Sequence, residues 1–157
     1  MKIYKRILIS LSAFIFLIAF GLLSLFLIKD RNKKENSAIL KIGDNHLEVE
    51  ITDTVLLQAR VLSGRPSLPE KQGMLFIFNG LAIRNFWMAG LKFPLDIIWI
   101  SGDKVVGFTE NLPPAAGIPE LYPSSEPVDK VLEINAGLVK KLGIAIGDKI
   151  KLNEDNR

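Results

Sequence analysis

Hydrophobic residues are unevenly distributed along the chain, and their pattern separates an apolar front segment from an alternating remainder. Ile7–Ile28 contains 22 residues without a charged side chain, and sixteen of them are Leu, Ile or Phe. A helix of this length rises about 33 Å, which matches a hydrocarbon core about 30 Å thick. At about −0.3 to −0.6 kcal/mol per residue, these sixteen residues favour insertion by roughly 5 to 10 kcal/mol. We therefore predict one N-terminal transmembrane helix.

A cleaved signal peptide is the alternative interpretation of this segment, because Lys2, Lys5 and Arg6 form a positively charged start. Signal peptides normally have apolar regions of about 7–15 residues, and the small-x-small site Ala19–Gly21 lies inside the run. The two flanks carry three and four Lys or Arg residues, so the positive-inside rule is nearly balanced. Because the first flank resembles an export signal, we expect a retained single-pass anchor in the cell membrane, with the C-terminal domain outside the cytoplasm.

The segments around this run define the predicted domain organisation. Residues 1–6 form the cytoplasmic start, and residues 29–37 form a charged tether that contains no apolar residue. One domain follows over residues 38–153, and residues 154–157 form a short tail. A domain of this size buries about two-thirds of the surface of its unfolded chain. One hydrophobic core is therefore sufficient to stabilise the domain without disulfides, which the chain cannot form because it has no Cys.

Within the domain, short alternating or continuous apolar runs predict strands. Leu47–Ile51 alternates apolar and acidic residues, as a half-buried strand does, and Gly43–Asn45 before it favours a hairpin turn. Gly73–Phe78 is an almost continuous apolar run, which is typical of a strand covered on both faces. Further strands are predicted at residues 39–42, 85–88, 95–100, 104–109, 131–134 and 149–152.

Two short helices complete the predicted domain. The first begins at Thr52 or Asp53 and reaches about Leu62, and the second is capped by Asn135 and ends at Gly143. These elements predict a mainly β (α+β) fold, a small barrel-like or curled mixed sheet with two short helices.

A proline-rich loop interrupts the predicted strands. Asn111–Pro127 holds five of the eight prolines, and proline lacks the backbone donor that a central strand needs. Long loops in compact domains are uncommon and are often functional. We therefore include this loop among the candidate binding segments.

The charge distribution limits the class of partner. The whole chain has a net charge of +3. Residues 36–157 hold 13 basic and 15 acidic residues, a net charge of −2, so the basic excess lies beside the apolar run. Basic residues in that position meet anionic lipid headgroups. Because the folded part has no basic excess, we expect no nucleic-acid binding.

Most common catalytic constellations are absent from the sequence. His46 is the only histidine and there is no cysteine, which excludes zinc sites built from His and Cys and excludes a Cys–His pair. A Ser–His–Asp triad could use only His46, which lies beside a predicted hairpin turn. The phosphate-binding, dinucleotide-binding and EF-hand motifs do not occur. We assign no catalytic residue, no metal ligand and no cofactor.

Four motifs in one chain resemble the DUF192 family, a domain of unknown function in bacteria and archaea. They are GMLF at residues 73–76, FWM at 86–88, PLD at 94–96 and VLE-NAG at 131–137, and the resemblance covers about residues 47–152. It implies a small, mainly β and often exported domain, and it implies no reaction. The chain departs from the family pattern at Ala89–Leu91, where a polar Lys-Asn-Thr is common, and at Val61 and Ser63, where Gly and Met are typical.

Four residues are candidate binding residues, each with a structural alternative. Trp87, together with its neighbours Phe86 and Met88, forms an aromatic platform for a sugar or peptide, or the three belong to the core. Asp96 is a functional carboxylate, or it accepts hydrogen bonds in a turn or cap or pairs with an arginine. Arg65 binds an anionic ligand, or it satisfies helix carbonyls and pairs with an acid. Tyr122 forms the lip of a groove, or it lies in a loop without a ligand.

Three functions are consistent with the sequence. The leading hypothesis is a membrane-anchored, extracytoplasmic binding module whose partner is an envelope protein, a peptide or a saccharide. The second is an enzyme of unknown substrate that uses carboxylate chemistry at Asp96 or Glu133, without His or Cys. The third is a structural accessory that tethers an envelope complex through the proline-rich loop. An enzyme needs two titratable groups that converge in one pocket, whereas a binding module needs an exposed aromatic side chain.

Overall fold

The computed structural model describes residues 16–24, 37–52, 62–115 and 120–153. The chain divides into two compact units, Met1–Asn36 and Ser37–Arg157. In the first unit residues 16–24 are helical. Among the described residues, no helix combines the length and the apolarity that crossing a bilayer requires. Most of the predicted span Ile7–Ile28 lies outside the described residues, so the transmembrane helix stays a prediction.

The second unit is built on one sheet of seven strands in the order β6-β5-β8-β3-β2-β1-β9. Neighbouring strands are antiparallel except for β2 and β3, which are parallel. A separate pair is formed by β4 (Asn85–Phe86) and β7 (Tyr122–Pro123). The seven strands are β1 (Ser37–Ile42), β2 (Asn45–Thr52), β3 (Gln72–Ala82), β5 (Leu95–Ser101), β6 (Lys104–Leu112), β8 (Val128–Asn135) and β9 (Ile150–Asn153).

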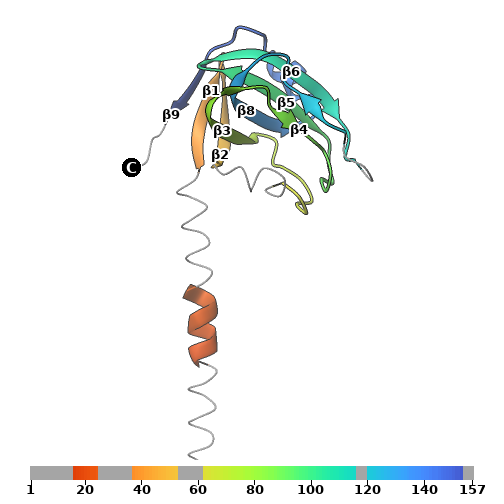
Figure 1. Ribbon diagram of the computed structural model, residues 1–157. Coiled ribbons are helices and arrows are strands. Elements are labelled where there is room, and N and C mark those ends of the chain that lie inside the picture. Colours follow the sequence, from red (N-terminus) through yellow and green to blue (C-terminus); the bar gives the residue numbers. More distant parts are fainter. Residues whose placement is uncertain (1–15, 25–36, 53–61, 116–119, 154–157) are drawn as a thin grey trace, which may run out of the picture. The chain divides into compact units, whose positions relative to one another are not determined.

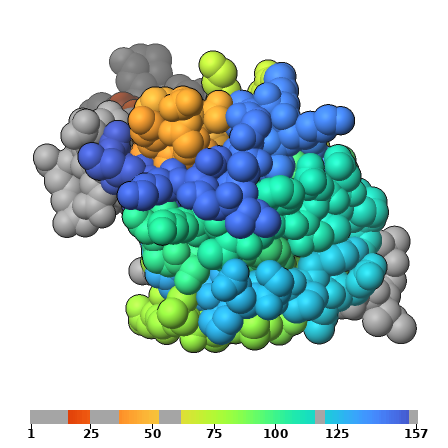
Figure 2. Space-filling model, turned by 90° about the horizontal axis from the view of Figure 1, so that it is seen from above, coloured from red at the N-terminus to blue at the C-terminus, as the bar shows by residue number. Residues whose placement is uncertain are grey.

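The sheet curls until its two outer strands meet at one end (Figure 1). A bridge joins Lys104 at the start of β6 to Lys149 just before β9. The Val105 N–H donates to the Asp148 carbonyl at 2.9 Å, and the Ile150 N–H donates to the Asp103 carbonyl at 2.8 Å. Figure 2 shows the dark blue C-terminal segment between orange β1 and green residues around the start of β6. The predicted mainly β, curled sheet is confirmed.

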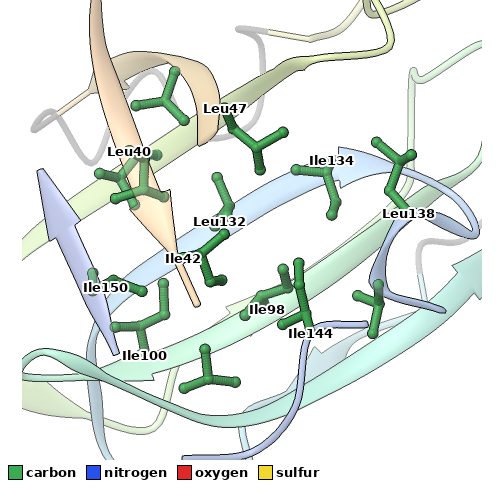
Figure 3. Packing of buried hydrophobic residues seen from close by; sticks show 14 residues of the cluster. Leu40, Ile42, Leu47, Ile98, Ile100, Leu132, Ile134, Leu138, Ile144 and Ile150 are labelled. Atoms are coloured by element: carbon green, nitrogen blue, oxygen red, sulfur yellow. The ribbon is translucent and has the colours of Figure 1, made fainter. Parts of the chain in front are cut away.

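The two faces of the sheet bury two separate hydrophobic clusters. The inner cluster gathers side chains from β1, β5 and β8 with others from α2 (Leu138–Leu142), as Figure 3 shows for Ile42, Ile98, Ile134 and Leu138. The outer cluster contains Met74, Phe76, Ile97, Trp99 and Val131, and residues 62–68 and 86–93 contribute to it. Because successive side chains of a strand point to opposite faces of the sheet, the same strand can contribute side chains to both clusters.

Strand β3 shows this division and confirms the prediction of a strand covered on both faces. Leu75 belongs to the inner cluster, whereas Met74 and Phe76 belong to the outer one. The predicted hairpin is also confirmed, since β1 pairs with β2 and Ile42 lies opposite Asn45.

Three expectations are corrected or limited by the structure. Strand β6 extends to Leu112, and the proline-rich loop contains the short strand β7, which pairs with β4. The predicted helix before Gly143 is confirmed, but Asn135 does not cap it. The N-cap is Gly137, with φ 82°, because Asn135 is still in β8 and its amide donates to the Leu68 carbonyl at 2.7 Å. The other predicted helix, from Thr52 or Asp53 to about Leu62, falls almost entirely on residues 53–61, which lie outside the described residues, and Thr52 itself is the last residue of β2.

Candidate functional site

Trp87 is the exposed member of an otherwise buried triplet. Its neighbours Phe86 and Met88 are 5% and 0% exposed, whereas Trp87 is 37% exposed. The extended backbone on either side turns alternate side chains to opposite sides. The structural alternative is therefore correct for Phe86 and Met88, while Trp87 presents its indole to solvent.

The pairing of β4 with β7 brings a second apolar side chain to Trp87. Phe86 lies opposite Tyr122, and the Ser124 N–H donates to the Arg84 carbonyl at 2.9 Å. Continued by one residue, this antiparallel register places Leu121 opposite Trp87. Leu121 is itself exposed, so the residue that follows β4 and the residue that precedes β7 are both exposed apolar residues.

The segment leading into β4 adds two more exposed aliphatic side chains. Leu81 and Ile83 are exposed, and Ala82 and Arg84 between them are partly buried. The same alternation continues through residues 85–88. We call Leu81, Ile83, Trp87 and Leu121 together the Trp87 strip. The sequence does not distinguish these residues, because apolar side chains occur on both sides of this stretch, and Leu81, Ile83 and Leu121 were not among the candidate residues.

Arg84 holds the backbone behind the Trp87 strip. Its guanidinium lies 4.0 Å above the centre of the Phe78 ring and donates to the Gly80 carbonyl at 2.8 Å. The backbone N–H of Arg84 donates to the Ser124 hydroxyl at 3.0 Å. A cation over an aromatic face is attracted by the ring quadrupole. These contacts tie together β3, β4 and the segment after β7.

Tyr122 is a partly buried residue of β7. The ring packs against the outer cluster, opposite Phe86. Its hydroxyl donates to Glu120 Oε2 at 3.0 Å. The hydrogen bond to the Glu120 carboxylate raises the pKa of Tyr122, because that contact stabilises the neutral phenol.

Asp96 serves as a buried acceptor for two backbone groups. Its Oδ1 accepts from the Asn111 N–H at 2.8 Å, and its Oδ2 accepts from the Val139 N–H at 3.0 Å. The Val139 N–H belongs to the first turn of α2, and Asn111 has a positive φ of 57°. A carboxylate at that position satisfies a helix donor that has no partner within the helix. The cap-acceptor alternative is therefore the observed one.

Glu133 is buried on the other face of the same sheet. It lies between Met74 on β3 and Ile97 on β5 and is 5% exposed. Within the described part of the chain its carboxyl has no hydrogen-bond partner, and burial raises the pKa of Glu133 to about 8. Asp96 lies opposite Ile134, one residue away in register, so its side chain points to the inner face. The structure does not bring Asp96 and Glu133 together.

Arg65 pairs with an acid, as its structural alternative predicted. Its Nη1 and Nη2 donate to the two carboxylate oxygens of Glu50 on β2, at 2.9 and 2.7 Å. This bidentate hydrogen bond raises the pKa of Arg65, and partial burial opposes the shift. The pair joins residues 62–71 to the outer side of β2.

Two departures from the family pattern touch each other. The Ser63 hydroxyl donates to the Gly90 carbonyl at 3.2 Å, and the Gly64 N–H donates to the same oxygen at 3.3 Å. Gly90 has φ 79°, and a Cβ added there would lie 2.7 Å from Ser63 Oγ. The two positions form one contact, which sequence reasoning treated as two separate differences.

No metal centre is found among the residues that the structure describes, since no three His, Asp or Glu side chains gather there. The described site is therefore a surface feature, the Trp87 strip, above an outer core that holds one buried carboxyl. It can contact an apolar or aromatic-stacking partner. The two candidate carboxyl groups, Asp96 and Glu133, do not converge there, because the sheet separates them.

Solved structures share this fold. A crystal structure of a protein from Sinorhizobium meliloti, described as a candidate transcription regulator, is 29% identical, covers 74% of this chain and 93% of its own, and has a TM-score of 0.69. A protein of unknown function from Novosphingobium aromaticivorans is 32% identical, covers 73% of this chain and 84% of its own, and has a TM-score of 0.66. Among the curated proteins none matches this chain.

The profile of one family, DUF192 (Uncharacterized ACR), matches residues 38–152, which is nearly the whole second unit. The match runs from the second residue of β1 to the last but one of β9 and includes every motif on which the resemblance in sequence depended. The chain belongs to the DUF192 family.

Proposed function

We propose that this protein is a membrane-anchored binding module whose β domain lies outside the cytoplasm and binds its partner at the Trp87 strip. The observation that carries the proposal is the exposure of Trp87 together with that of Leu81 and Ile83 on the same stretch of chain and of Leu121 next to β7. Scattered apolar residues are normal on protein surfaces, but a group of large ones is typical of an interaction site. Tryptophan is also enriched among the residues that dominate binding energies.

The anchoring rests on the sequence. The uncharged run Ile7–Ile28 is long enough to span a bilayer, and the basic residues lie on both sides of it. The tether that follows is polar throughout, which suits a connection between a lipid phase and a folded domain. The export-like start favours a domain outside the cytoplasm.

A binding module accounts for the geometry and the charge better than an enzyme or a DNA-binding protein. An enzyme based on Asp96 or Glu133 would need a second titratable group close to the acid, and the two acids cannot serve each other because they occupy opposite faces. One solved relative is described as a candidate transcription regulator, but residues 36–157 of this chain hold more acidic than basic residues. That charge balance does not favour DNA, which binds basic surfaces.

Two measurements test the proposal. Alkaline carbonate extraction of cells that express the full chain should leave it in the membrane pellet at full length. Single cysteines introduced by Asn36→Cys or Arg157→Cys should react with a membrane-impermeant maleimide in intact cells or spheroplasts. The natural chain has no cysteine, so it is the matched control. Full-length protein in the supernatant, or labelling only after lysis, would refute anchoring or orientation respectively.

A further inference from the structure

We infer that the partner of the Trp87 strip is the lipid bilayer that carries the anchor, so that the β domain docks on its own membrane. This inference rests on the anchoring proposed above and names the partner for the same surface. The strip would enter the headgroup region with Trp87 at its polar boundary and with Leu81, Ile83 and Leu121 beside it.

The length of the tether keeps the domain next to the bilayer. Eight residues, 29–36, separate the end of the apolar run from Ser37, where β1 begins. Fully extended, they span at most about 28 Å. A folded unit of this size has a radius of gyration of about 14 Å, so the tether is no longer than the domain is wide. A short tether makes contact an intramolecular event with a high effective concentration.

The composition of the strip fits a lipid interface. Tryptophan is enriched at the boundary between water and hydrocarbon, where its amphipathic ring lies at headgroup level. The other three members of the strip are aliphatic, and their transfer from water to an apolar phase is favourable. All four side chains are already exposed, so docking requires no opening of the domain.

Three polar groups beside the strip, those of Arg84, Tyr122 and Ser124, favour a bilayer over a saccharide. The Arg84 guanidinium donates to the Gly80 carbonyl, the Tyr122 hydroxyl donates to Glu120, and the Ser124 hydroxyl accepts from the Arg84 N–H. These groups already have partners within the protein. A sugar site needs free donors and acceptors for the sugar hydroxyls, whereas a bilayer needs mainly apolar surface.

The charges indicate that docking depends on apolar contact rather than on attraction to anionic lipid. The tether holds four basic and two acidic residues, while residues 36–157 have a net charge of −2. The basic residues next to the span favour headgroups directly. The domain itself has no net positive charge that would attract it to an anionic surface. Docking should therefore also occur on a zwitterionic bilayer and should change little with salt concentration.

Tryptophan fluorescence of the full chain in phosphatidylcholine nanodiscs tests the inference. The chain has two tryptophans, and Trp99 is an internal reference because it is buried and donates to the Thr109 hydroxyl at 3.1 Å. Replacing part of the lipid with lipid brominated near the top of the acyl chains should remove about half of the Trp87 emission. Trp87→Phe should abolish the quenched component and leave the Trp99 emission.

Matched variants locate the contact. Leu81→Ser and Leu121→Ser should reduce the quenching of Trp87, because each removes an apolar side chain from the strip. Ile146→Ser is the control, since Ile146 is 66% exposed but lies between α2 and β9, and it should leave the quenching unchanged. Equal loss of quenching in all three variants would overturn the inference.

The outcomes separate this inference from the proposed anchoring. If the chain stays with the nanodiscs but Trp87 is not quenched, docking is refuted while anchoring stands. In that case a dimer that Trp87→Ala disrupts would assign the strip to a second copy, and a blue shift of Trp87 on adding an apolar peptide or an oligosaccharide would assign it to that ligand. If the chain does not stay with the nanodiscs, anchoring itself is refuted and docking with it.

Discussion

Asp96 and Glu133 lie on neighbouring strands but on opposite faces of the curled sheet. Asp96 is opposite Ile134 and Glu133 is opposite Ile97, so the two acids differ by one position in the register of β5 and β8. A shift of one residue reverses the face to which a side chain points. Asp96 therefore meets the backbone of α2, and Glu133 meets the apolar side chains of the outer cluster. The two carboxyl groups consequently have different structural roles.

Replacement of Asp96 should destabilise the domain. Asp96→Ala leaves the Asn111 and Val139 N–H groups without the acceptor that each now has. An unsatisfied buried donor costs about 1–3 kcal/mol, so we expect a loss of roughly 2–5 kcal/mol in the free energy of unfolding. Urea unfolding followed by circular dichroism in mild detergent measures it. Asp103→Ala, at an exposed turn, is the control, and an unchanged midpoint for Asp96→Ala would contradict the assignment.

Glu133 should make the stability of the domain depend on pH. Burial raises the pKa of Glu133 in the folded state to about 8, above its ordinary value of 4.5. The folded state therefore holds a proton that the unfolded state releases. The stabilising contribution is complete below pH 4.5 and is lost as the pH rises through 8. The slope between these values is about 1.4 kcal/mol per pH unit.

The variant Glu133→Gln isolates this effect, because the amide is nearly isosteric with the protonated carboxyl and does not titrate. Unfolding free energies measured at about pH 5.5 and 7.5 should fall by roughly 2 kcal/mol more in the natural chain than in the variant. The variant should be the more stable protein at the higher pH. Parallel pH profiles for the two proteins would mean that Glu133 ionises freely.

The pair of Arg65 and Glu50 should contribute modestly to stability. Both side chains are partly exposed, and bidentate pairs of this kind couple by about 0.5–1 kcal/mol. Each residue also has further interactions, so single substitutions would overstate the pair. A double-mutant cycle with Arg65→Ala and Glu50→Ala gives the coupling alone. A coupling energy near zero at low salt would show that the pair has no stabilising role.

Gly90 and Ser63 should be energetically coupled. Gly90→Ala places a Cβ 2.7 Å from Ser63 Oγ and adds the strain of a positive φ. We expect a loss of about 1–2 kcal/mol, part of which reflects the left-handed backbone. Ser63→Ala removes the hydroxyl, so the loss on Gly90→Ala should be smaller in that background. Gly102→Ala, where a Cβ meets no atom and φ is also positive, controls for backbone strain. Additive effects of the two changes would rule out the contact.

Much of the fold could be predicted from local pattern. The hairpin of β1 and β2, the doubly covered strand β3 and the turn between β5 and β6 each followed from residues that are close in sequence. The boundaries were less accurate. Strand β6 extends further than its apolar residues indicate. Strand β7 was not predicted, because the prolines in and around it favour a loop. Asn135 has the residue type of a helix cap, but its strand continues through it.

The sequence by itself determined where the long apolar segment lies, which stretches alternate between apolar and polar residues, and which family motifs the chain carries. These properties depend only on residues that are neighbours along the chain. Only the tertiary structure decided that Arg65 meets Glu50, that Ser63 meets Gly90 and that Trp87 lies outside while Phe86 lies inside. It also decided that the sheet separates Asp96 from Glu133. Such relations depend on which strands pair and in what register, and pairing is selected by packing of the whole sheet rather than by local preference.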